Sequence, residues 1–405
     1  MSTRFRLRDI GATYGGLTGK TKTDFGEGVA TFIPFLEVIN NPRLSGNALE
    51  RVKVSTGERQ NRVMRGDLIF NGSSETPEEV ALSAVVDFDT QKTTYLNSFC
   101  FGFRLHPGVS VDPHYLSYFF RSGVGRKLVG SLAQGATRYN IAKTKFLDLE
   151  LPVPDIGQQR AIADALKNVD DLIAMVERLI AKKQAIKTGM MQQLLTGKTR
   201  LPGFLEPWKE VSVSSLGRVV GGGTPSTRMP AYWGGGIPWF TPAEIKADGS
   251  GPLSRSERTI TDEGLANSAA SLLPAGSVLV TSRASIGNCA IAADLVSTNQ
   301  GFTSLVPKDN RSTWFYYYWV QQNRAAFESR AAGSTFLEIS ASKVSTIPIS
   351  VPGLEEQEAI GKVVRDVDTE IEVLLRRAAK VRAIKQGMMQ QLLTGRTRLP
   401  VEAAA

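Results

Sequence analysis

Apolar residues recur every three or four positions through two long stretches of this 405-residue chain. The stripe of residues 154–203 is Ile162, Leu166, Val169, Ile173, Val176 and Ile180, and that of residues 352–400 is Ile360, Val364, Val367, Ile371, Leu374 and Val381. Such steps keep one face of a helix turned toward a partner helix. The pattern predicts two paired helices of about 40 residues, each about 60 Å long.

These two stretches are copies of one another. Gly189–Gly197 and Gly387–Gly395 share the sequence GMMQQLLTG, and the offset of 198 residues holds without a gap. Solenoid periods are only about 20–50 residues, so this spacing indicates a duplicated domain. Each helix is acidic in its first half and basic in its second. Antiparallel packing places opposite charges side by side, and we expect that arrangement. Two amphipathic helices that pack elsewhere, with merely solvated charges, are the alternative.

The segments before the two helices follow one order of elements. Short apolar runs between turn residues predict strands, and a longer apolar segment predicts a helix. The expected strands are 31–38, 67–70, 80–88 and 99–105, followed by a helix at 113–132. In the second segment Ile237–Pro242 corresponds to Phe32–Glu37, Gly276–Val280 to Gly66–Phe70, Asn299–Phe302 to Asn97–Cys100, and a helix is expected at 312–331. The expected fold class is α+β: two duplicated α/β domains, residues 1–153 and 204–351, joined by two long antiparallel coiled-coil helices with pseudo-twofold symmetry. Residues 401–405 are expected to be an unstructured tail.

Charge and composition narrow the function. A net charge of +9 and a pI near 9.5 favour a polyanionic partner, with a membrane surface or plain solubility as alternatives. No apolar run approaches 18 residues and no apolar leader follows Met1, so we expect a cytoplasmic protein. The only cysteines, Cys100 and Cys289, are expected to be buried free thiols.

Motifs for catalysis are incomplete. Tyr14–Thr21 approximates a phosphate-binding loop, but Tyr14 replaces its first glycine. A basic loop near a phosphate of a polyanionic partner, or a surface turn, fits this segment better. His106 and His114 are the only histidines, and neither has a cysteine or carboxylate at metal-ligand spacing. We therefore expect no catalytic, cofactor-binding or metal-binding residues.

Several motifs resemble those of the specificity subunit of a type I restriction–modification system. They are Met190–Phe204, Pro352–Gln357, Gly222–Ser226, Tyr232–Pro242, Thr281–Gly287 and Thr298–Phe302. The first domain lacks the Gly-Gly-Thr-Pro and Tyr-Trp-Gly-Gly elements of the second. The resemblance implies a non-catalytic subunit with two target recognition domains, each binding one half of an asymmetric bipartite site on double-stranded DNA. It also implies two modification subunits that bind S-adenosylmethionine and methylate adenine, restriction subunits that use ATP and Mg²⁺, and no cofactor in this chain.

Polar turns with basic, amide, hydroxyl or aromatic side chains are the candidate DNA contacts. In the first domain these are Lys20, Lys22, Arg59, Arg62, Arg65, Asn71, Arg138 and Tyr139, and in the second Thr224, Ser226, Thr227, Arg228, Trp233, Arg283, Asn299, Gln300, Thr335 and Phe336. For each of them a solvated loop or a turn-stabilising side chain is the alternative. Two other functions stay open: a structural adaptor whose helices recruit proteins, and a methyltransferase fused to its recognition domains.

Overall fold

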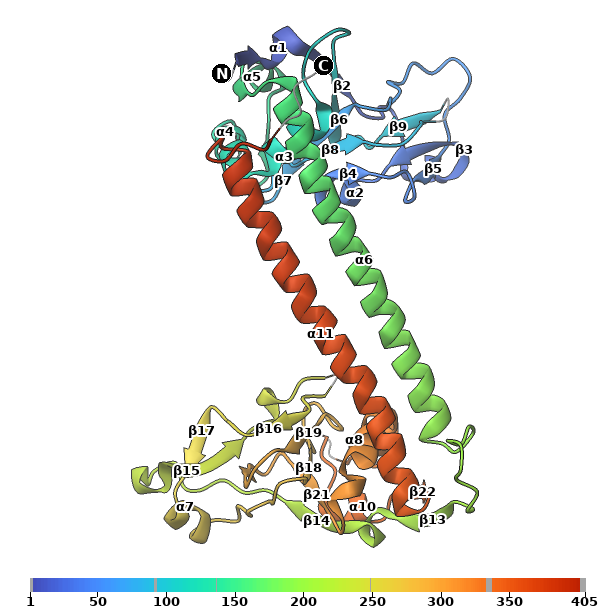
Figure 1. Cartoon of the computed structure of the whole chain (residues 1–405), viewed down its shortest axis with the longest axis vertical. Helices are drawn as coiled ribbons and strands as arrows, with labels where there is room; N and C mark the ends of the chain where they lie inside the picture. The colour runs from blue at the N-terminus through green and yellow to red at the C-terminus, as the bar shows by residue number, and fades with distance from the viewer. Residues whose placement is uncertain (1–2, 91–92, 136, 248, 333–336, 401–405) are drawn as a thin grey trace. The chain divides into compact units, whose positions relative to one another are not determined.

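The computed structural model describes residues 3–90, 93–135, 137–247, 249–332 and 337–400, and its contacts divide the chain into two units. Unit 1 comprises Met1–Glu177 with Arg377–Ala405, and unit 2 comprises Arg178–Arg376. Two 39-residue helices, α6 (Ile156–Leu194) and α11 (Leu354–Leu392), are drawn green and red in Figure 1. Each unit therefore contains the first part of one long helix and the last part of the other.

Unit 1 has a five-stranded sheet ordered β2-β10-β6-β8-β4, a three-stranded sheet ordered β5-β3-β9, and the pairs β1-β12 and β11-β7. Its strands are β1 (Thr3–Arg6), β2 (Gly11–Gly15), β3 (Phe25–Ile33), β4 (Arg43–Leu44), β5 (Glu50–Val52), β6 (Leu68–Asn71), β7 (Ser73–Ser74), β8 (Ser83–Val86), β9 (Thr94–Leu96), β10 (Cys100–Leu105), β11 (Tyr139–Asn140) and β12 (Glu150–Val153). Its short helices are α1 (Leu7–Ile10), η1 (Lys22–Asp24), α2 (Phe35–Asn40), α3 (Pro113–Arg121), α4 (Gly123–Gly130) and α5 (Lys143–Leu147).

Unit 2 repeats this arrangement with sheets ordered β14-β21-β18-β19-β16 and β17-β15-β20 and the pair β13-β22. Its strands are β13 (Lys209–Ser212), β14 (Gly217–Gly221), β15 (Trp233–Phe240), β16 (Pro252–Leu253), β17 (Arg258–Ile260), β18 (Val278–Val280), β19 (Cys289–Ala292), β20 (Ser297–Thr298), β21 (Thr303–Pro307) and β22 (Pro348–Val351). Its short helices are η2 (Val213–Ser215), η3 (Pro230–Tyr232), η4 (Pro242–Glu244), α7 (Asp262–Ala266), η5 (Asn310–Ser312), α8 (Thr313–Gln322), α9 (Arg324–Glu328) and α10 (Ala341–Ser345). The duplication predicted from the sequence is confirmed.

The ends of the long helices belong to the cores of the two units. In unit 1, Ile162 and Leu166 of α6 pack with Leu392 and Leu393 of the α11 end against the aromatic side of α3. In unit 2 the corresponding core contains Ile360, Val364, Met191, Leu194 and Leu195, packed against α8. The GMMQQLLTG tails thus fill equivalent places in the two cores. Because close-packed interiors tolerate volume changes poorly, this packing accounts for the identity of the leucines and methionines of the tails.

The stripes lie where paired helices require apolar side chains. All twelve stripe residues are buried or half-buried. In unit 1, Asp170 and Glu177 of α6 pair with Lys385 and Arg382 of α11. In unit 2, Lys183 and Lys187 of α6 pair with Glu370 and Asp368 of α11. In both units a rising number on one helix meets a falling number on the other, so the helices are antiparallel as predicted.

The structure corrects several element boundaries. The helix expected at 113–132 is broken at Ser122, whose backbone is extended (ψ 161°) and whose hydroxyl caps α4 by accepting from Gly125 N. The helix expected at 312–331 is likewise broken at Asn323. Val38, expected in a strand, lies in α2, because β3 ends at Ile33 before Pro34. As expected, Cys100 and Cys289 are free and buried, and burial raises the pKa of both thiols to about 12.

Candidate nucleic-acid interface

In unit 2 the loop after β14 contacts the turn after β20. A Cβ added at Gly222 would lie 2.0 Å from the carbonyl oxygen of Asn299, so only glycine permits this approach. Gly223 N donates to Thr298 O at 2.9 Å, and the Thr224 hydroxyl donates to Gln300 Oε1. The predicted residues Thr224, Asn299 and Gln300 therefore lie together.

Strand β15 contains a bulge, and the tryptophans on either side of it contact this loop. Trp233 and Ile237 both pair with Ile260, so the glycines at 234–236 are displaced from the strand pairing. The Trp233 ring meets the Trp239 ring edge-on with centroids 5.0 Å apart. Trp233 Nε1 donates to Ser226 O at 3.2 Å, and Trp239 Nε1 donates to Gly223 O at 2.9 Å. The two indoles thus hold the loop against β15.

Arg258 of β17 completes this group, although it is not among the DNA contacts predicted from the sequence. Its guanidinium carbon lies 3.6 Å from the centre of the Trp233 ring and 5.4 Å from that of Trp239. The Arg258 side chain is exposed, and within the described residues it makes no hydrogen bond or ion pair. An arginine stacked on an indole keeps its N–H donors available in the plane of the group.

Unit 1 contains the same construction with different residues. Phe25 and Ala30 of β3 both pair with Val52, and the rings of Phe25 and Phe32 meet edge-on with centroids 5.1 Å apart. Gly26 and Gly28 have φ values of +89° and +94°, a conformation that favours glycine. The first domain therefore has its own aromatic–glycine bulge, although its sequence lacks the Tyr-Trp-Gly-Gly motif. The strand registers make Phe32 of unit 1 the equivalent of Trp239 of unit 2. The correspondence predicted for Phe32–Glu37 is therefore wrong by two residues.

The segment that approximates a phosphate-binding loop is the counterpart of Gly221–Thr227. A Cβ at Gly16 would lie 2.0 Å from Asn97 O, and Leu17 N donates to Leu96 O at 2.8 Å. These contacts repeat those of Gly222 and Gly223. Only the three-residue helix η1 follows the loop, and Lys20 Nζ pairs with a Glu58 oxygen at 2.5 Å. That contact, together with hydrogen bonds from the Ser55 backbone and the Gln60 side chain, lowers the pKa of Glu58 to about 2. The segment is thus a glycine turn of the duplicated framework.

Other candidates of unit 1 differ in accessibility. Lys22, Arg59, Arg62 and Arg138 are exposed, and Tyr139 is half-buried. The Arg138 guanidinium lies 5.5 Å from the centre of the exposed Phe99 ring. Asn71 is a correction: it is fully buried, and its amide donates to the Ser73 and Glu79 carbonyls. Its side chain stabilises a turn and is not available to DNA.

The remaining candidates of unit 2 also differ in accessibility. Ser226, Thr227 and Arg228 are exposed. Arg283 Nη2 pairs with Glu338 Oε1 at 2.9 Å, so its charge is already partnered. Asn299 Oδ1 accepts from Gly301 N at 2.8 Å, which makes its side chain part of the turn. Thr335 and Phe336 lie outside the described residues.

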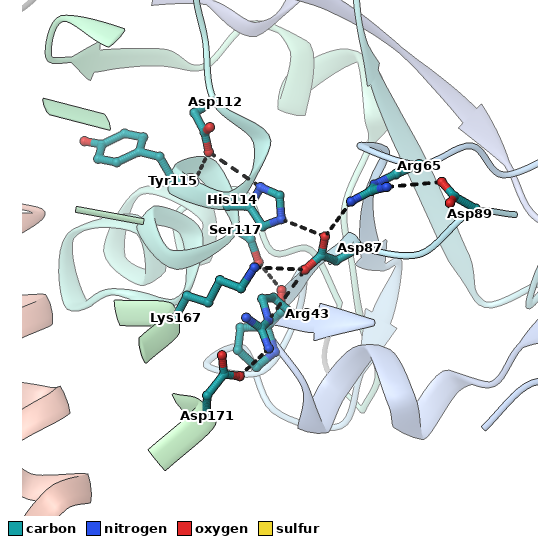
Figure 2. Close-up of polar contacts among 11 residues, drawn as sticks. Arg43, Arg65, Asp87, Asp89, Asp112, His114, Tyr115, Ser117, Lys167 and Asp171 are labelled. Atoms are coloured by element: carbon teal, nitrogen blue, oxygen red, sulfur yellow. Dashed lines mark hydrogen bonds and ion pairs between the residues drawn. The ribbon is translucent and has the colours of Figure 1, made fainter. Parts of the chain in front are cut away.

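Arg65 belongs to a cluster around Asp87 (Figure 2). Oxygens of Asp87 lie 3.7 Å from Arg65 Nη2, 3.9 Å from Arg43 Nε and 3.8 Å from Lys167 Nζ. His114 Nε2 is 3.3 Å away without hydrogen-bond alignment. Arg43 also pairs with Asp171 of α6 at 2.6 Å. The cluster therefore ties the edge strand β4 to α6.

Replacing Asp87 by asparagine is expected to destabilise unit 1 by about 1–2 kcal/mol, because four basic side chains lose a largely buried partner. Asp89 is the matched control: it contacts Arg65 at 3.2 Å, but its side chain is 90% exposed. Asp89→Asn should change the free energy of unfolding by less than about 0.5 kcal/mol. Urea denaturation at low and high salt measures both. Equal effects of the two substitutions would contradict the assignment.

Unit 2 has no equivalent of this cluster in its described part. Pro252 of β16 stands where unit 1 has Arg43, since each pairs in parallel with the neighbouring strand at the same position. A cleft of about 650 Å³ lies beside Pro252, with Arg365 and Asp368 of α11 among its lining residues. The edge strands β4 and β16 therefore differ in the polar groups that lie between them and the long helices.

A second polar contact occurs in both units. Tyr118 Oη donates to Asp170 Oδ2 at 2.8 Å, and Lys385 Nζ pairs with Asp170 Oδ1 at 2.5 Å. In unit 2, Tyr318 Oη donates to Asp368 Oδ2 at 2.7 Å, and Lys187 Nζ pairs with Asp368 Oδ1 at 2.6 Å. Burial, followed by the nearby carboxylate, raises the pKa of both tyrosines. Each Tyr–Asp–Lys contact joins a unit's own helix to both long helices.

Within the described ranges, no group of three or more histidine, cysteine, aspartate or glutamate side chains is arranged to hold a metal ion. No helix in that part of the chain is long and apolar enough to cross a bilayer.

The sequence of this chain matches a known family. A family model described as the type I restriction modification DNA specificity domain matches residues 3–184 and again residues 205–382. The two matches together cover most of the sequence. The chain therefore belongs to the family of type I restriction–modification specificity subunits, as the motifs indicated.

Individual relatives extend this comparison. The chain is 38% identical over 167 residues to the type I restriction enzyme MjaIX specificity subunit of Methanocaldococcus jannaschii, covering 41% of this chain and 39% of that protein. It is 24% identical over 404 residues to the putative MjaX specificity subunit of the same organism, covering 95% and 90%. A type I restriction–modification S subunit from M. genitalium has the same fold, with a TM-score of 0.61 at 14% identity over 97% and 96% of the two chains.

Proposed function

We propose that the chain recognises an asymmetric, bipartite site on duplex DNA, with one half-site bound by each unit. One observation carries this proposal: the two units share a backbone construction but differ in the side chains it presents. The glycine turn, the bulge and the edge-to-face aromatic pair are common to both units. Different exposed side chains on a common frame suit recognition of two different short sequences.

The chemistry of the exposed residues supports a DNA partner. Lys22, Arg59, Arg62 and Arg228 are exposed cations that suit phosphate contacts, and the net charge is +9. Phosphate contacts supply affinity and make it salt-dependent, whereas contacts to base edges in the major groove supply specificity. With two separate readers, the paired helices would then fix the distance between the half-sites.

The same proposal includes the partners of the family. We infer that the chain is non-catalytic and acts with two modification subunits, which bind S-adenosylmethionine, and with restriction subunits, which use ATP and Mg²⁺. The GMMQQLLTG tails occupy equivalent places in both units, and this duplication suits two copies of one partner. The chain itself is expected to bind none of these cofactors. We also expect the complex to act in the cytoplasm.

The decisive experiment is a gel shift of the whole chain, with and without its modification subunits, on random duplexes and on a selected sequence. We expect binding that weakens steeply as salt rises, and a preference for two separated base blocks. Absence of DNA binding in every combination would instead favour the adaptor function. Binding of S-adenosylmethionine by the isolated chain would favour a fused methyltransferase.

A further inference from the structure

Arg258 and Glu50 occupy equivalent positions in the two units. Arg258 of β17 lies directly opposite Trp239 of β15, and Glu50 of β5 lies directly opposite Phe32 of β3. Trp239 and Phe32 are each the buried member of their unit's edge-to-face aromatic pair. Directly opposed residues on paired strands point to the same face of a sheet. The duplicated frame therefore presents a cation in unit 2 and a carboxylate in unit 1 at one position.

Both side chains are accessible. Arg258 and Glu50 are exposed, and neither side chain makes a hydrogen bond or ion pair within the part of the chain that the structure describes. Two predicted DNA contacts, in comparison, are already paired: Lys20 with Glu58 in unit 1 and Arg283 with Glu338 in unit 2. Charged groups held on a strand without a partner are suited to a partner supplied by the ligand.

The aromatic pair orients Arg258 in advance. Stacking on the Trp233 ring at 3.6 Å restricts the guanidinium before any ligand arrives. A restricted fork loses less conformational entropy when it forms two parallel hydrogen bonds. The O6 and N7 acceptors of guanine match that fork in the major groove.

Glu50 has the opposite requirement. A carboxylate is repelled by phosphate, so next to bound DNA it is stabilised where a base offers it a donor. The exocyclic amino group of cytosine is such a donor in the major groove. An acidic residue at this position thus contributes selectivity and cannot act as a general phosphate contact.

We propose that Arg258 and Glu50 are specificity-determining residues, each reading one base pair of the half-site bound by its unit. Arg258 selects a guanine and Glu50 selects a base with an exposed amino group. This assignment depends on the proposed function, since it names the residues that would read the two half-sites.

The test is selection from a random duplex library by the whole chain, alone and with its modification subunits, followed by sequencing. Arg258→Gln should lower discrimination at one base pair of one half-site by roughly 5- to 150-fold and leave the other half-site unchanged. Arg258→Lys keeps the charge but not the fork, so it should retain overall affinity and lose the same discrimination. Glu50→Gln should alter one base pair of the other half-site only.

Arg255→Gln and Glu75→Gln are matched controls, because both residues are exposed and their side chains make no hydrogen bond or ion pair within the described residues. Both variants should select the parental site. Circular dichroism melting verifies that all variants are folded. An equal loss of affinity on every sequence in Arg258→Gln would make Arg258 a phosphate contact and overturn its assignment. A parental chain that enriches no sequence, alone or with its modification subunits, would overturn the proposed function itself, whereas unchanged selectivity in the variants would overturn only the two residue assignments.

Discussion

Replacing Leu166 by alanine is expected to lower the free energy of unfolding of unit 1 by about 2–5 kcal/mol. Leu166 is fully buried, in the core shared by α6, the end of α11 and the domain helix α3. Truncation would leave a cavity where three elements meet, and close-packed cores relax only partly around such a cavity. Urea denaturation, with hydrogen exchange of peptides from α3, measures the effect.

Met175 provides the control on the same helix. Its side chain is 59% exposed, so Met175→Ala should change the free energy of unfolding by less than about 0.5 kcal/mol. Exchange should quicken in α3 for the Leu166 variant and stay unchanged for the Met175 variant. Similar losses from both substitutions would show that the long helix contributes to unit 1 through general helix stability and not through this core.

The sequence predicted the helical part of the fold because periodicity and charge act locally. The stripe from Ile162 to Ile180 requires only the spacing of apolar residues, and the antiparallel order requires only the sign of charge along each helix. The break at Ser122 escaped this reasoning. Its hydroxyl caps α4, and the apolar pattern continues across it. A serine inside an apolar stretch can therefore mark the start of a new helix even where the apolar period continues.

The candidate interface was less predictable, because it depends on strand pairing. Arg258 lies on a three-residue strand, and only its pairing with β15 places it over Trp233. Asn71 follows a buried run and has a polar amide, yet tertiary packing encloses it. The bulge of unit 1 was missed because Phe25 and two separated glycines replace the motif of unit 2. Backbone conformation is retained there while residue identity is not.

Asp170→Asn is expected to destabilise unit 1 by about 2–4 kcal/mol, because it leaves the ammonium of Lys385 without its charged partner. The side chains of Asp170 and Lys385 are only 18% and 21% exposed. The same ammonium also lies 5.7 Å from the centre of the Tyr118 ring. Asp170 therefore holds three elements of the unit together, and its loss should affect all three.

The exposed Asp164 of the same helix makes no ion pair within the described residues, so Asp164→Asn should be nearly neutral. A double-mutant cycle with Lys385→Met should give a coupling energy of at least about 1 kcal/mol.

Asp368→Asn makes the matched change in unit 2, where Tyr318 and Lys187 are the partners. Its effect on hydrogen exchange should appear in α8 and not in α3. Faster exchange in α3 for that variant would mean that the two units do not respond separately, whereas a local effect in each case would show that the duplicated contact stabilises each unit by itself.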